Sequence, residues 1–435
     1  MTSTKDTEFA NSVGLIEQSV KFTSNNSLNA MPSARVTGAR ARALLVLAMV
    51  LLPFGVRADV SLYGIVDLSF YYNVVSRSAN ALGGAVNASQ AGITSGVLSG
   101  SRWGIKGTDT IADGWSSGFV LESGINAQEG TLGQGGLGFG RQATVSLMSR
   151  ELGTLEMGRK GTFSYLYMVP IDPFSLSGSQ AGAGSSFGSA NGLRFNNLIT
   201  YETPTIQGFQ AGIGYSFNTG LSAIYADGPT LQEQAATNRF GRKGNMRGFT
   251  AALRYNNGPL SLLLTYDAVY GANEVIDKND KTVPNNVKAV PKAWILGGSY
   301  DFKLLKLAAA IGQTKSGLFL GQSAGAGGYQ SPLETSSADA NVIFSGGTRV
   351  TSYLLSATIP VRGTDKLLLS WQGMLPRGIL EDASQLSNQL ILSAAYIHQL
   401  SKRTDLYLWG SYGNNYQSFS TAKSSVIGTG IRHLF

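Results

Sequence analysis

Charged side chains are sparse in this sequence of 435 residues, and seven of them are candidates for a functional site: six basic residues in or beside short segments that alternate apolar and small residues, and one aspartate in a long segment rich in glycine and serine. Only 14% of the residues are charged, against about 25% in an ordinary globular chain. Guanidinium and ammonium groups act on ions by Coulombic attraction, so the chemistry they suggest is selection among ions rather than bond making. The seven residues are Arg102, Lys106, Arg141, Arg159, Lys160, Asp172 and Arg194.

Covalent, metal and nucleotide chemistry find little support in the sequence. Cysteine is absent and the two histidines are His398 and His433, which argues against thiolate and multi-histidine metal sites. Neither histidine is placed to serve a nucleophile, so no catalytic residue is expected. The segment GQGGLG, which begins at Gly133, matches G-x-G-x-x-G but lies in a loop between strands, so no cofactor is expected. The net charge of +8 is dispersed without a basic run, which argues against nucleic acid.

Alternation assigns a face to three of the cations. In SRWGIKG the tryptophan and the isoleucine share the apolar face, which places Arg102 and Lys106 on the other face. In RFNNLITYE the apolar face holds Phe195 with Ile199, so Arg194 lies opposite them. These three basic side chains should therefore face away from the apolar surroundings of their strands.

The cations in LEMGRKG and FGRQATVSL are harder to place. Strict alternation puts Lys160 on the polar face but Arg159 on the apolar face, and Arg141 has the same difficulty. Both arginines fall at strand ends, where one extra residue in a bulge would turn the side chain to the other face.

The elements that carry these residues are strands. In GFQAGIGYSFN, for example, aromatic and aliphatic residues take every second position and Gly, Ser, Gln and Asn take the others. About sixteen such segments follow residue 58. The 55 glycines of the chain also favour a protein built of strands and turns. Their connections alternate strictly between short turns, such as RGTD, and long loops: 76–98, 128–138, 162–193, 219–246, 271–289, 315–347, 375–386 and 415–421.

This regularity predicts an all-β, 16-stranded antiparallel transmembrane β-barrel over residues 59–435. Such barrels have even strand numbers, short turns at one end, long loops at the other and apolar residues outside. Closure is required because an unpaired sheet edge cannot be left in lipid. The chain ends in GTGIRHLF, whose apolar face runs to Phe435, so we expect the last strand to pair with the first.

Residues 1–58 are expected to be an N-terminal extension followed by a secretory signal peptide. An apolar run from Ala43 to Val56 follows three arginines and precedes VRA, which predicts cleavage after Ala58. A signal that began at Met31 would have an ordinary length, so translation is expected to start there or to include a disordered extension.

The mature chain resembles a Gram-negative general diffusion porin, most closely the betaproteobacterial type. The resemblance covers it end to end and rests on the segments DVSLYGIVDLSFYY, SGSRWGIKGTD, FGRQATVSL, GTLEMGRKGTF, IDPFSLSG and GTGIRHLF in this order. It implies an outer-membrane homotrimer whose third long loop, residues 162–193, folds into each pore and faces a basic wall. It also implies that Arg159 faces the pore and that the assembly machinery of the outer membrane recognises Phe435.

These expectations combine into a water-filled channel for ions and small hydrophilic solutes, embedded in outer-membrane lipid and lipopolysaccharide. Several cations opposite one loop carboxylate, Asp172, predict a preference for anions. Inward acids temper this preference: Asp67, Glu122, Glu202, Asp267 and Asp405.

Other functions stay open at this point. A substrate-specific channel would use a line of inward aromatics, for which Tyr63, Tyr71, Tyr407 and Trp409 are candidates. A closed barrel with an enzymatic or adhesive role would need bulky inward residues, whereas the inward positions are often small.

Overall fold

The computed structural model describes residues 59–79, 85–177, 180–225, 232–234, 244–276, 282–319, 322, 342–378 and 387–435. All of them belong to one compact unit, Arg57–Phe435. The expected extension, the start at Met31, the signal peptide and the cleavage after Ala58 lie outside the described residues.

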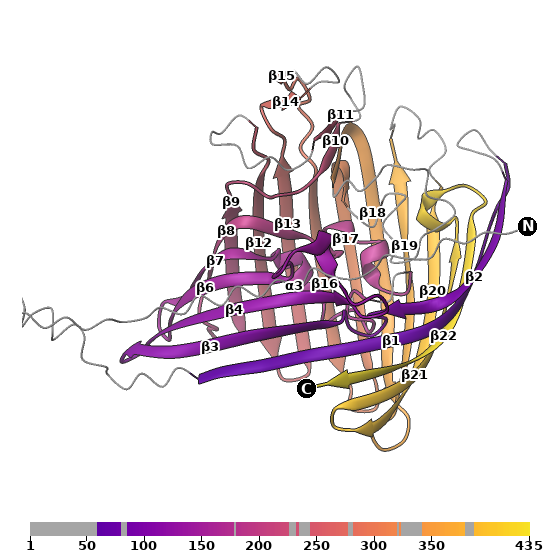
Figure 1. Cartoon of the computed structure of the whole chain (residues 1–435), viewed down its shortest axis with the longest axis horizontal. Coiled ribbons are helices and arrows are strands. Elements are labelled where there is room, and N and C mark those ends of the chain that lie inside the picture. Colours follow the sequence, from indigo (N-terminus) through magenta and orange to yellow (C-terminus); the bar gives the residue numbers. More distant parts are fainter. Residues whose placement is uncertain are drawn as a thin grey trace, which may run out of the picture. The chain divides into compact units, whose positions relative to one another are not determined.

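The unit is a closed antiparallel β-barrel of sixteen strands, in which β2 and β3 together occupy one position (Figure 1). The barrel strands are β1(Asp59–Arg77), β2(Val86–Ser95), β3(Arg102–Ala112), β4(Trp115–Asn126), β6(Gln142–Ser149), β7(Gly153–Gly161), β8(Arg194–Glu202), β9(Phe209–Ser216), β12(Arg247–Asn257), β13(Leu260–Tyr270), β16(Lys292–Asp301), β17(Lys306–Phe319), β18(Val342–Pro360), β19(Lys366–Arg377), β20(Gln389–Ser401), β21(Thr404–Asn414) and β22(Lys423–Leu434).

Short and long connections alternate as the sequence predicted. β3 and β4 are joined by two residues, 113 and 114, whereas β7 and β8 are joined by residues 162–193. The long connections contain the small elements β5(Thr131–Leu132), α2(Gly133–Gly136), α3(Phe163–Met168), η1(Ala183–Ser185), η2(Gly188–Ala190), β10(Ala223–Tyr225), β11(Gln232–Gln234), β14(Glu274–Ile276), β15(Thr282–Pro284) and η3(Tyr416–Ser418).

One expected loop is partly strand. The predicted loop 76–98 contains β2, which pairs with the upper half of β1, while β3 pairs with the lower half. Residues 96–101, here called the inward segment, interrupt this barrel position. The sequence pattern did not predict β2 as a strand, because alternation breaks at these irregular residues.

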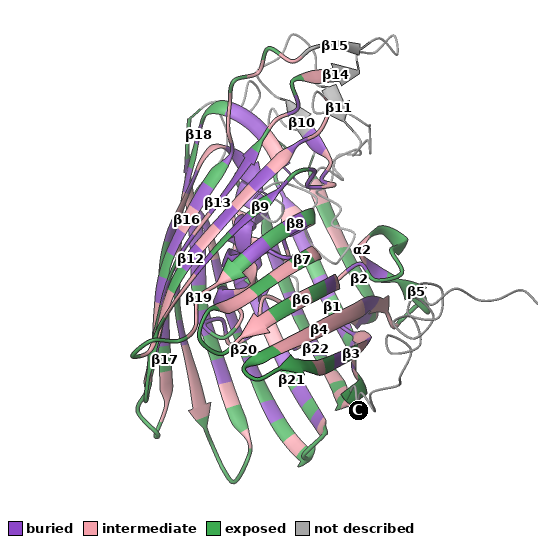
Figure 2. Cartoon of the chain, turned by 90° about the vertical axis from the view of Figure 1, so that its left-hand side faces the viewer, coloured by how far each residue is buried: buried purple, intermediate pink, exposed green. Residues whose placement is uncertain are grey.

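Burial alternates along the strands and separates two faces (Figure 2). On β13, Leu262 and Leu264 are exposed on the outside, whereas Thr265 and Asp267 are buried on the inside. The exposed apolar side chains form the band that a barrel presents to lipid. Within the described ranges, no helix has the length and apolar character needed to cross a membrane.

The last strand closes the barrel against the first, as predicted. β22 pairs with β1 from Ser76↔Lys423 to Ile65↔Leu434. Beyond the strand, the backbones of Gly64 and Phe435 exchange two hydrogen bonds of 3.0 Å. A side chain at position 64 would overlap the Phe435 ring, so the glycine lets the ring lie against the backbone.

The third loop, residues 162–193, lies inside the barrel. Its helix α3 packs on β12, β13 and β16, and the side chains of Phe163, Met168 and Phe187 are fully or almost fully buried. They contact inward residues such as Leu263 and Ile295. Each buried side chain of this size stabilises the packed loop by about 1.5–3 kcal/mol.

Polar wall residues hold the other half of this loop through its backbone. Gln372 Nε2 donates to the carbonyls of Ala181 (2.9 Å) and Gly182 (3.1 Å). Gln389 Nε2 donates to Ser185 O at 3.1 Å, and Ser352 Oγ donates to Ser186 O at 2.6 Å. Inward Ser and Gln residues on β18–β20 therefore serve to satisfy loop carbonyls that would otherwise be buried without a donor.

Candidate functional site

Three arginines meet at one place on the inner wall. Arg141 Nε lies 2.6 Å from Glu122 Oε1, and Arg102 Nε lies 3.8 Å from Glu122 Oε2. Arg141 and Arg194 donate to the hydroxyl of Tyr165 at 3.3 and 3.1 Å. These five residues, here called the arginine cluster, line a cavity of about 330 Å³ between the wall and the third loop.

The barrel brings the three arginines together from the same end of alternate strands, because β4 lies between β3 and β6, and β7 lies between β6 and β8. Arg102 and Arg194 are the first residues of β3 and β8, and Arg141 immediately precedes β6. Glu122 reaches Arg102 diagonally across β3 and β4, where Arg102 pairs with Gly124. Tyr165 comes from α3, so the third loop supplies the wall opposite the arginines.

The charges of the arginines lower the pKa of the tyrosine in the cluster, Tyr165. Burial raises the pKa of the Tyr165 hydroxyl, but the charges of Arg194, Arg141 and Arg102 outweigh burial and lower this pKa to about 8. The Arg194 guanidinium carbon lies 4.7 Å from the centre of the Tyr165 ring, a cation–π contact that fixes the ring beneath it.

Asp172, the loop carboxylate expected to face the basic wall, does not do so. It is 3% exposed and accepts hydrogen bonds from the backbone of Ala183 (2.8 Å), Leu176 (2.9 Å) and Phe174 (3.2 Å). Burial raises the pKa of Asp172 to about 6, although these hydrogen bonds oppose the rise. Its carboxylate shapes the loop, and the carboxylate of the arginine cluster is Glu122.

Three further predicted cations lie outside the lining of the cavity. Lys106 is exposed, with its Nζ 5.3 Å from the centre of the Tyr63 ring. Lys160 forms ion pairs with Glu156 and, at 3.8 Å, with Glu202.

Arg159 donates to Gly140 O at 2.8 Å and to Asn196 Oδ1 at 2.6 Å. The β7–β8 register shifts between Gly158 and Lys160, and Gly158 has a φ of +138°. The pairing is therefore irregular at this strand end, with the extra residue on β8 rather than on the strand of Arg159.

The same irregularity corrects the face assigned to Phe195. This ring is fully buried on the inside rather than exposed to lipid, whereas Ile199 is exposed as predicted. Asn197 has a φ of +47°, and β8 has one residue more than β7 between the paired positions on either side of the shift, two residues (196 and 197) against one (159). Alternation therefore changes phase between Phe195 and Ile199. Arg194 contacts Tyr165 although its neighbour Phe195 also lies on the inside, an arrangement that simple alternation does not allow.

Sequence reasoning did not assign two members of the cluster, Glu122 and Tyr165, to the constriction. Glu122 was recognised as an inward acid, and its diagonal relation to Arg102 could have linked the two residues. Tyr165 gave no comparable signal, because the position of a loop side chain depends on how the whole loop packs.

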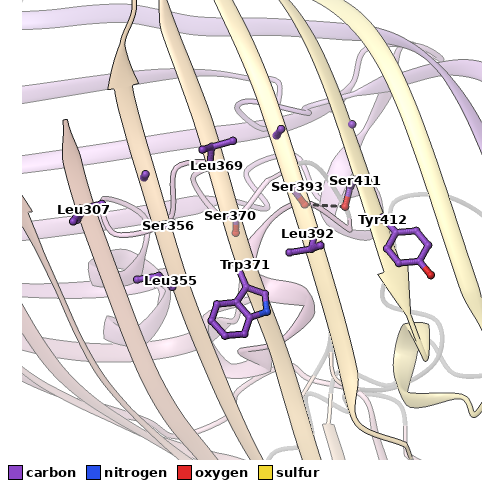
Figure 3. A pocket seen from close by; sticks show the side chains of 13 residues that line it. Leu307, Leu355, Ser356, Leu369, Ser370, Trp371, Leu392, Ser393, Ser411 and Tyr412 are labelled. Atoms are coloured by element: carbon purple, nitrogen blue, oxygen red, sulfur yellow. Dashed lines mark hydrogen bonds between the residues drawn. The ribbon is translucent and has the colours of Figure 1, made fainter. Parts of the chain in front are cut away.

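A larger hollow, of about 760 Å³, lies on the outer face of β17–β21 (Figure 3). The side chains of Trp371 and Leu392 are both 47% exposed there, whereas Ser370, Ser393 and Ser411 are buried on the inside. The hollow belongs to the apolar band. In the part of the chain that the structure describes, no group of acidic, histidine or cysteine residues could hold a metal ion.

Comparisons with known proteins agree with this architecture. The family model described as Gram-negative porin matches residues 43–418. An outer membrane porin protein of Bordetella pertussis is 38% identical over 390 residues, covering 87% of this chain and 94% of the relative. Outer membrane porin protein 32 of Delftia acidovorans is 29% identical over 360 residues, covering 81% and 82%.

A solved structure gives the same result. The anion-selective porin from Comamonas acidovorans is 25% identical, with a TM-score of 0.61, over 87% of this chain and all of the other. The Acinetobacter baumannii channel DcaP, at 13% identity and a TM-score of 0.55, shares the fold over 87% of this chain and 97% of its own. A closed sixteen-stranded barrel with an inward loop, together with these matches, shows that the chain belongs to the Gram-negative porin family of outer-membrane channels.

Proposed function

We propose that this porin prefers anions to cations, with the arginine cluster as its constriction. The observation that carries the proposal is the cavity of about 330 Å³ lined by Arg102, Arg141 and Arg194 and by one carboxylate, Glu122. In a narrow channel with low-dielectric walls, an excess of fixed positive charge raises the local concentration of anions.

The lack of a loop carboxylate in the lining of the cavity strengthens this preference. Where a loop carboxylate faces a basic wall, the opposing charges attract ions of both signs. Here the Asp172 carboxylate is bonded to its own loop backbone, so Tyr165 supplies a hydroxyl in place of a charge. The anion selectivity named for the Comamonas porin, at 25% identity, supports the same reading.

We propose passive diffusion of small hydrophilic solutes rather than recognition of one substrate. Tyr71, Tyr407 and Trp409 face inward as predicted, but each is 5% exposed or less and packs in one cluster with Phe174 of the third loop. These aromatics are closed to solutes, which argues against an aromatic path for one substrate.

The assembly proposals concern the outside of the barrel. A homotrimer embedded in outer-membrane lipid and lipopolysaccharide would cover the exposed apolar band, and one structure of the Vibrio cholerae protein OmpT is described as a trimer form. Phe435, held against Gly64 and 46% exposed, is available for recognition by the barrel assembly machinery.

Single-channel recording in a planar bilayer with a KCl gradient tests the ion preference. Ohmic steps with a reversal potential that favours chloride support the proposal. A reversal potential that favours potassium rejects the arginine cluster as the selective element. Absence of conductance from the folded protein rejects an open pore.

A further inference from the structure

The inward segment, residues 96–101, is an unusually large interruption of a barrel strand. Ser95 pairs with Leu68, and Arg102 pairs with Ile65. Six residues therefore stand opposite two residues of β1, residues 66 and 67. A common bulge places one extra residue on a strand, so this excess of four must leave the plane of the sheet.

The excess is directed into the barrel. Val97 and Leu98 are 2% and 3% exposed, and they share a cluster with Phe174 of the third loop and with Trp409 of β21. The next residue, Ser99, lines the same cavity as the arginine cluster. The inward segment therefore touches the third loop with one side and the cavity with the other.

Asp67 holds the inward segment in this position. Its Oδ2 accepts hydrogen bonds from the backbone of Leu98 and Ser99, both at 2.8 Å, and its Oδ1 accepts one from the Tyr407 hydroxyl at 2.5 Å. The Asp67 backbone bonds to both ends of the segment, to Gly96 N at 2.9 Å and to the Ser101 hydroxyl at 3.0 Å. Asp67 itself is fully buried.

A second anchor fixes the cavity-facing residue. Arg432 Nη1 donates to Ser99 Oγ at 2.9 Å, and its guanidinium is held by Asp405 at 2.6 Å. The inward segment is thus bonded to β1 and to β22, the two strands that close the barrel, and through Asp67 it is linked to Tyr407 on β21.

We propose that the inward segment is a second constriction element, which together with the third loop sets the size limit of the pore, and that Asp67 is its positioning residue. The contact of Leu98 and Val97 with the Phe174 cluster means that the segment also supports the third loop from the wall side. The inference rests on the chain forming a channel but not on the ion that the channel prefers.

Cysteine accessibility tests the position of the segment, because the natural chain contains no cysteine. We expect a neutral methanethiosulfonate reagent to reduce the single-channel conductance of Ser99→Cys. The matched control is Ser89→Cys, on β2 opposite the outward-facing Val74. The reagent should not change the conductance of this control channel. A Ser99→Cys channel that conducts normally and is unaffected by the reagent would overturn the placement of the inward segment beside the pore. Because the reagent is neutral, this result does not depend on anion preference.

Exclusion of neutral polymers tests the role of Asp67. Asp67→Asn keeps the size of the side chain but weakens its acceptors, so we expect passage of larger neutral polymers than in the parent protein. Asp109→Asn removes the same charge from β3 and should leave the polymer limit unchanged. Thermal unfolding of each variant, followed by gel mobility, separates a general loss of stability from a change in pore size.

If Asp67→Asn does not fold, Tyr407→Phe removes one bond to the Asp67 carboxylate and should shift the limit in the same direction. An unchanged polymer limit in a folded variant of either kind refutes the positioning role.

Discussion

Replacing Arg102 with glutamine should reduce chloride preference most cleanly. Of the two arginines that pair with Glu122, Arg102 has the more accessible side chain, at 25% exposure against 12% for Arg141. It forms one hydrogen bond, of 3.2 Å to Gly100 O, and a long ion pair of 3.8 Å. Its loss therefore removes charge with little effect on the third loop, whereas Arg194 contacts Tyr165 directly.

The magnitude follows from the change in fixed charge. Three guanidinium groups and one carboxylate leave two excess positive charges in the cluster, and Arg102→Gln leaves one. An ion that passes about 4 Å from a unit charge in water interacts with it by about 1 kcal/mol. Screening at 0.1 M salt, where the Debye length is about 10 Å, reduces this to about 0.7 kcal/mol.

The effect on selectivity is twice this energy, because the interaction has opposite sign for chloride and potassium. A difference of about 1.4 kcal/mol changes the permeability ratio about tenfold. At 1 M salt the Debye length is about 3 Å, so the change should shrink to about twofold.

Reversal potentials in KCl gradients measure this ratio directly. Arg102→Lys is the matched control, because it keeps the charge and should keep most of the chloride preference. The reasoning is refuted if Arg102→Gln and Arg102→Lys give the same reversal potential as the parent protein at low salt.

Four further changes probe the site and its supports. Glu122→Gln removes the carboxylate 2.6 Å from Arg141 and should increase chloride preference by a similar factor, read from the reversal potential. Because the pKa of Tyr165 is about 8, raising the pH from 7 to 9 should deprotonate its hydroxyl. The new negative charge offsets one excess positive charge of the cluster and should lower chloride preference. Tyr165→Phe should abolish this pH dependence. Gln372→Leu leaves two loop carbonyls without their donor, at a cost of about 1–3 kcal/mol each, and should increase open-channel noise. Unchanged noise would contradict the role of Gln372 in holding the third loop. Phe435→Ala should lower the amount of assembled porin in the membrane without changing the conductance of refolded protein, and normal assembly would exclude a recognition role.

The barrel itself was predictable from the sequence because its signals are local. Side-chain alternation identifies a strand without reference to other strands, and the order of short and long connections determines the ends at which they lie. The pairing of Lys423–Leu434 with the first strand followed from the same logic, since a lipid-exposed edge is not tolerated.

Local signals failed wherever a strand is irregular. Alternation has a period of two, so any odd insertion reverses the faces beyond it. This reversal misplaced Phe195 and left Arg159 unresolved. β2 was missed for a different reason, because the six residues of the inward segment interrupt its barrel position. Nothing in a short window of sequence records how many residues the partner strand contributes.

The sequence by itself determined the barrel, its closure and which strands carry basic residues, because these properties depend on periodicity and chain connectivity. Only the tertiary structure decided that Arg102, Arg141 and Arg194 meet around Tyr165 while Asp172 turns into its own loop. The reason is physical: the third loop must satisfy its buried backbone groups inside the barrel, and the packing that does so selects which side chains face the remaining space.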